Sequence, residues 1–272
     1  MIHPTAIVFT GARLGPGTTV GPYSVVGENV IVGARCRIEA HVQLTGHTTI
    51  GDDNRFHSGS VIGDAPQDFK YAGAPTRLRI GNGNTFREHV TVNRSNKLEE
   101  DTVLGDGNFF MAGSHVGHNC LIGNQNVFAN GALLAGHVTL SDRAFVSGNC
   151  LVHQFCRIGR LALMQGGSAI SKDLPPFCVA RGDNGICGLN VIGLRRAGVN
   201  AEQRLRLKRA YAILFRSGLR HEFALEKVEV EFEGEPLVEE MLTFIRASRR
   251  GLCADTRSPG HNHDGEDSVS EL

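Results

Sequence analysis

Apolar residues recur at every sixth position along the first 170 residues of the chain. From Ile2 the step reaches Val8 and Leu14, and it continues without a polar residue to Ile62. It resumes over 80–92 and again over 104–170. A second register, two positions earlier, holds small or compact residues that include Ala12, Thr18, Ser24, Cys36, Thr48, Asn108, Ser114, Cys120, Asn126 and Ala132. Two registers that stay in phase over this length predict a repeat fold.

A hexad is long enough for one short strand and a turn, so three hexads make a triangular coil of 18 residues. The apolar and the small side chains point inward, and coils stack about 4.8 Å apart through parallel strand hydrogen bonds. Asn108 and Asn126 are 18 positions apart and should form a buried amide ladder. The small inward register also holds Cys36, Cys120, Cys150 and Cys156, which predicts buried free thiols rather than a redox or metal role.

The predicted fold is an all-β parallel β-helix over residues 1–190, followed by a C-terminal α-helical domain over 191–251. The repeat is interrupted at about 64–78 and 93–102, which should leave the prism as loops. It should end at Pro175-Pro176, because proline cannot extend a strand ladder. Helices are expected over 201–215 and 237–248. The polar stretch 252–272 is expected to be a disordered tail.

The coil length also predicts which polar residues become neighbours. His118, Gly136 and Gln154 are successively 18 positions apart, so they should form one column on the outside of the prism. His137 and His153 lie one residue off this column, and the group should fall within about 10 Å. A single exposed histidine would not indicate a site, but three histidines with an amide in one column do.

His118 is the candidate general base, because imidazole accepts a proton near neutral pH. The N–H of Gly136 can bind a tetrahedral oxyanion, and the missing side chain permits close approach. His115 lies three positions before His118 on the same coil. No serine or cysteine lies in a nucleophile elbow, so the pattern predicts direct acyl transfer to a bound hydroxyl or amine. A metal site is the weaker interpretation, because no carboxylate or cysteine joins the histidines.

Several longer motifs carry a more specific signal. From Ile2 to about Gly251 the sequence resembles the UDP-N-acetylglucosamine O-acyltransferase family, whose members begin lipid A biosynthesis. The motifs are Pro66-Gln67-Asp68-Phe69-Lys70-Tyr71-Ala72-Gly73, His115-Val116-Gly117-His118-Asn119-Cys120, Leu134-Ala135-Gly136-His137-Val138, Val152-His153-Gln154-Phe155-Cys156, Asp173-Leu174-Pro175-Pro176 and Asn190-Val191-Ile192-Gly193-Leu194-Arg195-Arg196.

The resemblance implies a left-handed helix and a homotrimer with active sites between subunits. It implies transfer of an (R)-3-hydroxyacyl group from acyl carrier protein to the 3-hydroxyl of UDP-N-acetylglucosamine. The phosphopantetheine arrives on the carrier, so no cofactor and no metal is expected. By family match, His118 is the base and Gly136 the oxyanion donor, while Gly166 sets the acyl length. The nucleotide sugar would be held by Asp68, Lys70, His115, His137, Gln154, Asn190 and Arg196, with His153 as the remaining cleft histidine.

The sequence departs from the family pattern at two places. Asn119 stands where the family often has aspartate after the catalytic histidine, and a neutral amide cannot stabilise an imidazolium as a carboxylate would. Ile192 stands where a glutamate is common. Acylation of a 3-amino sugar analogue therefore stays open as an alternative. A metalloenzyme of the carbonic anhydrase kind and a trimeric carrier-binding scaffold without catalysis are the other interpretations.

Charge and composition indicate which kinds of partner and which location to expect. The formal net charge is zero, which does not favour nucleic acid as a partner. No stretch has the apolar length needed to span a bilayer, and no signal segment is evident, so we expect a cytoplasmic protein. Eight basic residues are opposed locally only by Glu202, which fits either a solvated helix face or a docking surface for an acidic carrier protein. The resemblance favours the docking surface, because the family needs one. The eight residues are Arg195, Arg196, Arg204, Arg206, Lys208, Arg209, Arg216 and Arg220.

Overall fold

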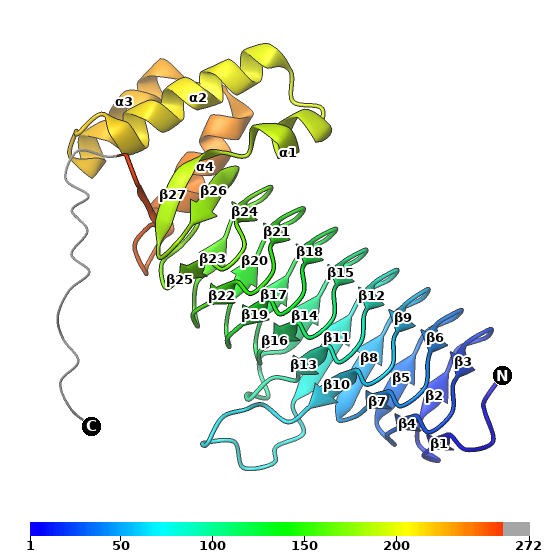
Figure 1. Cartoon of the computed structure of the whole chain (residues 1–272). Helices are drawn as coiled ribbons and strands as arrows, with labels where there is room; N and C mark the ends of the chain where they lie inside the picture. The colour runs from blue at the N-terminus through cyan, green and yellow to red at the C-terminus, as the bar shows by residue number, and fades with distance from the viewer. Residues whose placement is uncertain (258–272) are drawn as a thin grey trace.

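The computed structural model describes residues 1–257, whose short strands stack into a three-sided prism (Figure 1). Each side is one sheet, and we name the sides sheet I, sheet II and sheet III. The chain passes through the three sheets in turn and then begins the next coil. The fold is a left-handed parallel β-helix with helices at its C-terminal end, which confirms the predicted fold class.

Sheet I contains β1 (Ile7–Val8), β4 (Val25–Val26), β7 (Gln43–Leu44), β10 (Val61–Asp64), β13 (Thr91–Asn93), β16 (His115–Val116), β19 (Leu133–Leu134), β22 (Leu151–Val152) and β25 (Ala169–Ile170). Sheet II contains β2 (Arg13–Leu14), β5 (Val30–Val32), β8 (His47–Ile50), β11 (Arg77–Ile80), β14 (Thr102–Leu104), β17 (Leu121–Ile122), β20 (Thr139–Leu140) and β23 (Arg157–Ile158). Sheet III contains β3 (Thr19–Val20), β6 (Arg37–Ile38), β9 (Arg55–Phe56), β12 (Thr85–Phe86), β15 (Phe109–Phe110), β18 (Val127–Phe128), β21 (Phe145–Val146), β24 (Leu163–Met164), β26 (Cys178–Arg181), β27 (Gly185–Leu189) and β28 (Ala254–Asp255).

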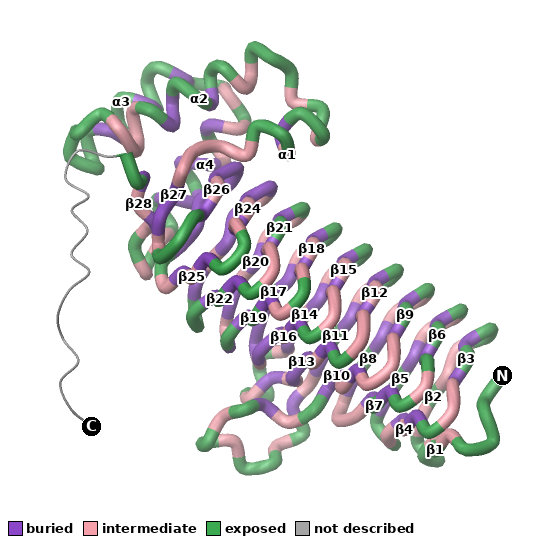
Figure 2. The backbone as a smooth tube through the Cα atoms, viewed as in Figure 1, coloured by how far each residue is buried: buried purple, intermediate pink, exposed green. Residues whose placement is uncertain are grey.

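The core runs along the inside of the prism. Figure 2 shows buried positions recurring from coil to coil. From Val20 onward the sixth-position residues are buried, whereas Ile2 is half exposed because it belongs to the terminal coil. Sheet III contributes a stack of four phenylalanines, with ring centroids 4.6 to 4.9 Å apart: Phe56, Phe86, Phe110 and Phe128. Such offset stacking adds to the burial of the rings.

Buried amides form the ladder expected on the inside of the prism, and it is longer than predicted. The N–H of Asn126 donates to Oδ1 of Asn108 at 2.9 Å, as the sequence predicts. The ladder continues through Asn84 and Asn54, at 2.8 and 2.9 Å. Each Oδ1 in the ladder thereby accepts from a backbone N–H of a neighbouring coil, which offsets the cost of burying that oxygen.

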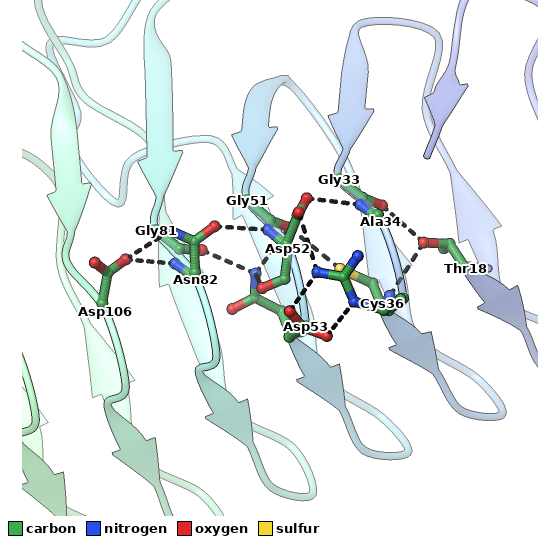
Figure 3. Close-up of polar contacts among 12 residues, drawn as sticks. Thr18, Gly33, Ala34, Cys36, Gly51, Asp52, Asp53, Gly81, Asn82 and Asp106 are labelled. Carbon is green, nitrogen blue, oxygen red and sulfur yellow. Dashed lines mark hydrogen bonds and ion pairs between the residues drawn. The ribbon is translucent and has the colours of Figure 1, made fainter. Parts of the chain in front are cut away.

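A second ladder runs along the outer corner between sheets II and III (Figure 3). Oδ1 of Asp52 accepts from the N–H of Ala34 at 2.8 Å, and Oδ1 of Asn82 accepts from the N–H of Asp52 at 2.8 Å. Asp106 repeats the contact with Asn82 at 2.6 Å. These side chains accept from corner N–H groups and so add to the backbone hydrogen bonds that join successive coils there.

The repeat continues one strand further than the prolines predict. Pro175 and Pro176 lie at a corner, and the chain then re-enters sheet III as β26, which pairs in parallel with β24. Proline is tolerated at a corner because no ladder hydrogen bond is needed from its nitrogen. β27 then pairs antiparallel to β26 and ends the prism.

The end of the prism is covered by α1 (Val191–Arg196), α2 (Ala201–Arg216), α3 (His221–Glu231) and α4 (Pro236–Arg246) (Figure 1). The periodicity of the sequence predicts α2 and α4 but not α1 or α3. α3 has a weak division between apolar and polar faces, which explains why its periodicity gave no signal. None of the helices in residues 1–257 is both long and apolar enough to cross a membrane.

The predicted disordered tail is wrong for residues 252–257. β28 lies in this segment and pairs in parallel with β27, and the hydroxyl of Tyr211 donates to the buried Asp255. Arg216 donates to the same carboxylate at 2.8 Å. A short strand of this kind is stabilised by its partners rather than by its own composition. Residues 258–272 lie outside the described part of the chain.

All seven cysteines are free, and the four in the inward register are buried, as predicted. Burial raises the pKa of the Cys120 thiol to about 12 and that of Cys156 to about 11. Thiols in this state are weak nucleophiles, which agrees with a packing role.

We expect Phe110→Ala to lower the free energy of unfolding by about 3–5 kcal/mol, because it opens a cavity in the middle of the ring stack. Chemical denaturation monitored by circular dichroism measures the change. Phe69→Ala is the control, since Phe69 is fully exposed and should change stability by less than about 0.5 kcal/mol. Equal effects of the two substitutions would contradict the importance of the stack.

Candidate active site

One corner of the prism, between sheets I and II, carries the predicted site. His118 follows β16 there, Gly136 follows β19 and Gln154 follows β22. The two insertions, 65–76 and 94–101, leave the prism at the same corner in the two preceding coils, and Figure 1 shows loops projecting beside β10 and β13. The chain therefore brings two loops and a column of polar residues to one place, which we call the I/II corner.

The neighbour of His118 fixes the tautomer of its imidazole ring. Nδ1 of His118 lies 2.8 Å from Oδ1 of Asn119. The backbone N–H of Asn96 donates to that same Oδ1 at 3.0 Å, while Nδ2 of Asn119 donates to Oε2 of Glu100 at 2.9 Å. A backbone N–H can only donate and a carboxylate can only accept, so the amide orientation is determined. Nδ1 of the neutral ring must then carry the hydrogen, which leaves Nε2 as the proton acceptor.

Nε2 of His118 faces the backbone of Gly136. A Cβ placed on Gly136 would lie 2.7 Å from Nε2, so the imidazole occupies the space that a side chain would need. Within residues 1–257 the N–H of Gly136 has no acceptor. The predicted pair of oxyanion donor and general base would need a backbone donor and an imidazole nitrogen placed side by side in this way.

Two further histidines pack close to the base. His137 lies edge-on to His118, with ring centroids 5.1 Å apart, and stacks on Phe155 at 4.6 Å. His115 is held by a 2.7 Å hydrogen bond between its Nδ1 and Oγ1 of Thr91. Burial lowers the pKa of both His115 and His137, so both rings are neutral near neutral pH.

His153 and Gln154 are exposed at the next coil. The Nδ1 of His153 lies 3.2 Å from the carbonyl oxygen of Gln154, and the side chain of Gln154 has no hydrogen bond within the described chain. Both side chains are therefore available to a ligand at the column.

An apolar cleft of about 680 Å³ lies over sheet I beside the I/II corner, although neither His118 nor Gly136 lines it. Its floor is made by outward residues of β19, β22 and β25, and its polar edge includes His115 and His153. The apolar part of the floor includes Leu133, Ala135, Leu151 and Ala169. Such a surface suits an extended hydrocarbon chain whose reactive end lies at the corner.

The first loop adds a carboxylate and a lysine to the corner. Asp68 accepts from the N–H of Lys70 at 2.9 Å and from Nδ2 of Asn96 at 2.7 Å. These hydrogen bonds, first the one from Lys70, lower the pKa of Asp68. The Lys70 side chain is exposed and has no ion pair in the described residues. The contact with Asn96 also joins the two loops.

Three of the predicted residues lie elsewhere on this chain. Gly166 follows β24, at the opposite edge of sheet I from His118. Asn190 caps α1, accepting from the N–H of Gly193 and donating to the carbonyl of Leu161 at 2.8 Å. Arg196, at the end of α1, is exposed. A single chain therefore does not bring Asn190 and Arg196 to the column.

The sequence analysis missed four residues at the I/II corner. Gln67 lines the cleft, Thr91 holds His115 and Phe155 supports His137. Glu100 reaches the base through Asn119. Phe155 is 18 positions after His137, so the coil period predicts that contact, whereas a loop residue such as Glu100 has no periodic position.

The eight basic residues between Arg195 and Arg220 differ in whether they form ion pairs. Arg206 pairs with Glu202 and Glu235, and Arg216 pairs with the buried Asp255. The expectation of Glu202 as the sole local opposition is therefore wrong, because folding brings distant carboxylates to the helix. Lys208, Arg209 and Arg220 remain exposed without an ion pair within residues 1–257.

Residues 1–257 contain no group of three histidine, cysteine, aspartate or glutamate side chains placed to hold a metal ion. The three clustered histidines each contact a different residue. His118 contacts Asn119, His115 contacts Thr91, and His137 stacks on Phe155.

Comparisons with known proteins identify the family. A family model described as Udp N-acetylglucosamine O-acyltransferase, domain 2, matches residues 173–253, and one described as bacterial transferase hexapeptide (six repeats) matches 11–46 and 101–136. An acyl carrier protein-dependent UDP-N-acetylglucosamine O-acyltransferase of Anaeromyxobacter sp. (strain Fw109-5) is 47% identical over 92% of this chain and 98% of that protein. This chain belongs to the UDP-N-acetylglucosamine O-acyltransferase family.

Solved structures of UDP-N-acetylglucosamine acyltransferases have the same fold. That of Francisella novicida is 33% identical, with a TM-score of 0.90 over 97% of this chain and 100% of that one. That of Bacteroides fragilis is 38% identical, with a TM-score of 0.89 over 93% of this chain and 99% of that one. The family resemblance read from the motifs is thus confirmed.

We expect Gly136→Ala to lower acyl-transfer turnover about a hundredfold, because the new methyl group displaces the imidazole of His118 from its position. Steady-state kinetics measures the loss. The backbone of Gly136 is not in the left-handed region, so the substitution should leave the thermal midpoint of unfolding nearly unchanged. Full activity would show that His118 need not lie against this residue.

Proposed function

We propose that this protein transfers an (R)-3-hydroxyacyl group from acyl carrier protein to the 3-hydroxyl of UDP-N-acetylglucosamine. The observation that carries the proposal is the position of Nε2 of His118 beside the N–H of Gly136, which has no acceptor within residues 1–257, while Nδ1 of the same ring contacts Asn119. Family membership supports the acyl carrier protein and UDP-N-acetylglucosamine as substrates, since the curated relatives are named as O-acyltransferases that use both.

The reaction needs one proton acceptor and one oxyanion donor. The sugar hydroxyl attacks the thioester carbonyl carbon while Nε2 of His118 accepts the hydroxyl proton. A carbon–oxygen bond forms, and the carbonyl oxygen becomes an oxyanion that the N–H of Gly136 stabilises. When the carbon–sulfur bond breaks, the proton passes from the imidazolium to the leaving thiolate. The ester product and the free carrier thiol balance the reaction.

The acyl chain is proposed to lie in the cleft across sheet I. Its thioester end would meet His118 at the I/II corner, and its far end would approach Gly166 at the other edge of the sheet. A Cβ on Gly166 would have open space except for the carbonyl of Gly148 at 3.6 Å. A larger residue at 166 would therefore extend into the path of a long chain.

The nucleotide sugar is proposed to bind through Asp68, Lys70, His115, His137, His153 and Gln154. We further propose that the working protein is a homotrimer in which Asn190 and Arg196 reach the site of a neighbouring copy. Their distance from the column within one chain supports this arrangement, because residues of the same nucleotide site must converge. A cytoplasmic location stays a prediction.

The decisive assay combines the purified protein with UDP-N-acetylglucosamine and 3-hydroxymyristoyl acyl carrier protein. We expect acylated sugar nucleotide from the wild type, and a loss of about a hundredfold or more for His118→Ala. Product formed equally well by the variant would remove His118 from catalysis. No product from the wild type, with product from the 3-amino sugar analogue, would overturn the hydroxyl as acceptor.

Docking of the acidic carrier should depend on Lys208, Arg209 and Arg220. We expect the triple substitution to glutamine to raise the KM for acyl carrier protein about tenfold at low salt, and to leave the KM for the sugar nucleotide unchanged. The difference from wild type should shrink as salt is added, because exposed charges are screened. If the KM for acyl carrier protein is the same in the triple variant as in the wild type, and does not change with salt, this docking surface is contradicted.

A further inference from the structure

The amide of Asn119 joins two groups of different chemistry. On one side its Oδ1 lies 2.8 Å from Nδ1 of His118, and on the other its Nδ2 donates to Glu100 at 2.9 Å. The three side chains thus form a continuous hydrogen-bonded chain that ends in a carboxylate. Asn119 is buried, so neither contact is exchanged freely for water.

The rest of the second loop holds this chain in place. Ser95 Oγ accepts from Nδ2 of Asn119 at 2.8 Å, and the N–H of Asn96 donates to Oδ1 at 3.0 Å. The N–H of Asn119 donates to Oγ1 of Thr102 at 2.7 Å, where the loop returns to the prism. Every polar atom of the Asn119 side chain therefore has a partner in the segment that carries Glu100.

Glu100 is charged at neutral pH. Its Oε1 accepts from Nζ of Lys97 at 2.9 Å, and this contact, followed by the one with Asn119, lowers its pKa. Its Oε2 also lies 3.9 Å from Nδ1 of His137. A permanent negative charge therefore lies one amide away from the ring that must become positive during the reaction.

We propose that Glu100 is a positioning residue that acts through Asn119 on His118: it fixes the ring tautomer and stabilises the imidazolium formed in the transition state. This inference rests on the proposed function of His118 as general base. A neutral amide has no charge of its own to offer, but polarisation by a carboxylate makes its oxygen a stronger acceptor. The departure at Asn119 from an acidic residue is thereby compensated by a carboxylate on the loop.

Other charged groups also face His118, and they differ from Glu100 in how they act. Asp68, on the first loop, acts on His118 through space. His115 and His137 face the same ring but are neutral, because burial lowers their pKa. Lys97 offsets part of the charge of Glu100. Among these groups, Glu100 has the hydrogen-bonded route to Nδ1.

The first test compares Glu100→Gln with Glu99→Gln. Both remove one negative charge from the same loop, and Glu99 is exposed without a polar contact in residues 1–257. We expect Glu100→Gln to lower kcat about tenfold and to leave the KM for the sugar nucleotide within about twofold. Glu99→Gln should behave as wild type.

The pH profile separates an electrostatic role from a merely structural one. A carboxylate favours the protonated imidazole, so its removal should move the acidic limb of the kcat/KM profile to lower pH. A structural role would lower the height of the profile without moving this limb. An unmoved limb, or equal behaviour of the two glutamine variants, would overturn the proposal.

Exchanging the amide and the carboxylate between positions 119 and 100 gives a second, independent test. In Asn119→Asp the new carboxylate faces that of Glu100, so we expect repulsion and impaired turnover. In the double variant Asn119→Asp/Glu100→Gln the glutamine amide can donate to the new carboxylate, which now accepts directly from Nδ1. We expect kcat to return to within about threefold of wild type. Losses that simply add would contradict the chain of contacts.

A measurement without substrate distinguishes failure of this inference from failure of the proposed function. Nuclear magnetic resonance of histidine-labelled full-length protein reports the tautomer and the titration of His118 directly. We expect the hydrogen on Nδ1 in the wild type, and a titration at lower pH in Glu100→Gln than in Glu99→Gln. Identical titrations would overturn the inference even if acyl transfer is observed, and a shift would support it even if the acceptor is a different sugar.

Discussion

Parallel hydrogen bonding between coils fixes a residue beside the one 18 positions later wherever no insertion intervenes, and the site depends on this constraint. Val25 pairs with Gln43, and Leu133 pairs with Leu151, in the same register. The inner amide ladder and the outer corner ladder use the same spacing and add side-chain contacts to it. A catalytic group placed on such a scaffold has little freedom to move along the axis, because a shift would break a whole ladder.

The corners of the prism hold the side chains that support His118. Asn119, His137 and Phe155 occupy equivalent corner positions, and all have a positive φ, between 58° and 66°. This backbone conformation turns their side chains outward at the column, where they support His118 from two coils. Asparagine tolerates it better than most residues, since its short side chain can bond locally. The strain at these corners is offset by the hydrogen bonds and ring contacts that each residue makes.

The column of His118, Gly136 and Gln154 could be predicted because it depends only on the coil length. The inward cysteines and the Asn108–Asn126 contact follow from the same rule. Glu100 could not be predicted in this way, because loop residues have no fixed phase relative to the prism. β28 was missed for a related reason: its two residues are ordered by β27 and by Tyr211, which lie far away in the sequence.

The two insertions show how a rigid repeat can carry a specific site. Val61 pairs with Thr91 at a separation of 30 residues, and Thr91 pairs with His115 at 24, so strand pairing resumes after both loops. The register shifts once, between Ile62 and Asp64, where the first loop leaves the prism. Lengthening a loop adds little to its closure entropy. The second loop then folds onto Asn119, which serves both as its anchor and as the contact of the base. Removing the amide would therefore disturb the loop and the imidazole together, whereas changing only the charge of Glu100 isolates the electrostatic part. The carboxylate that a neighbouring aspartate would place directly beside the base is here delivered from outside the repeat, without altering the corner that holds His118.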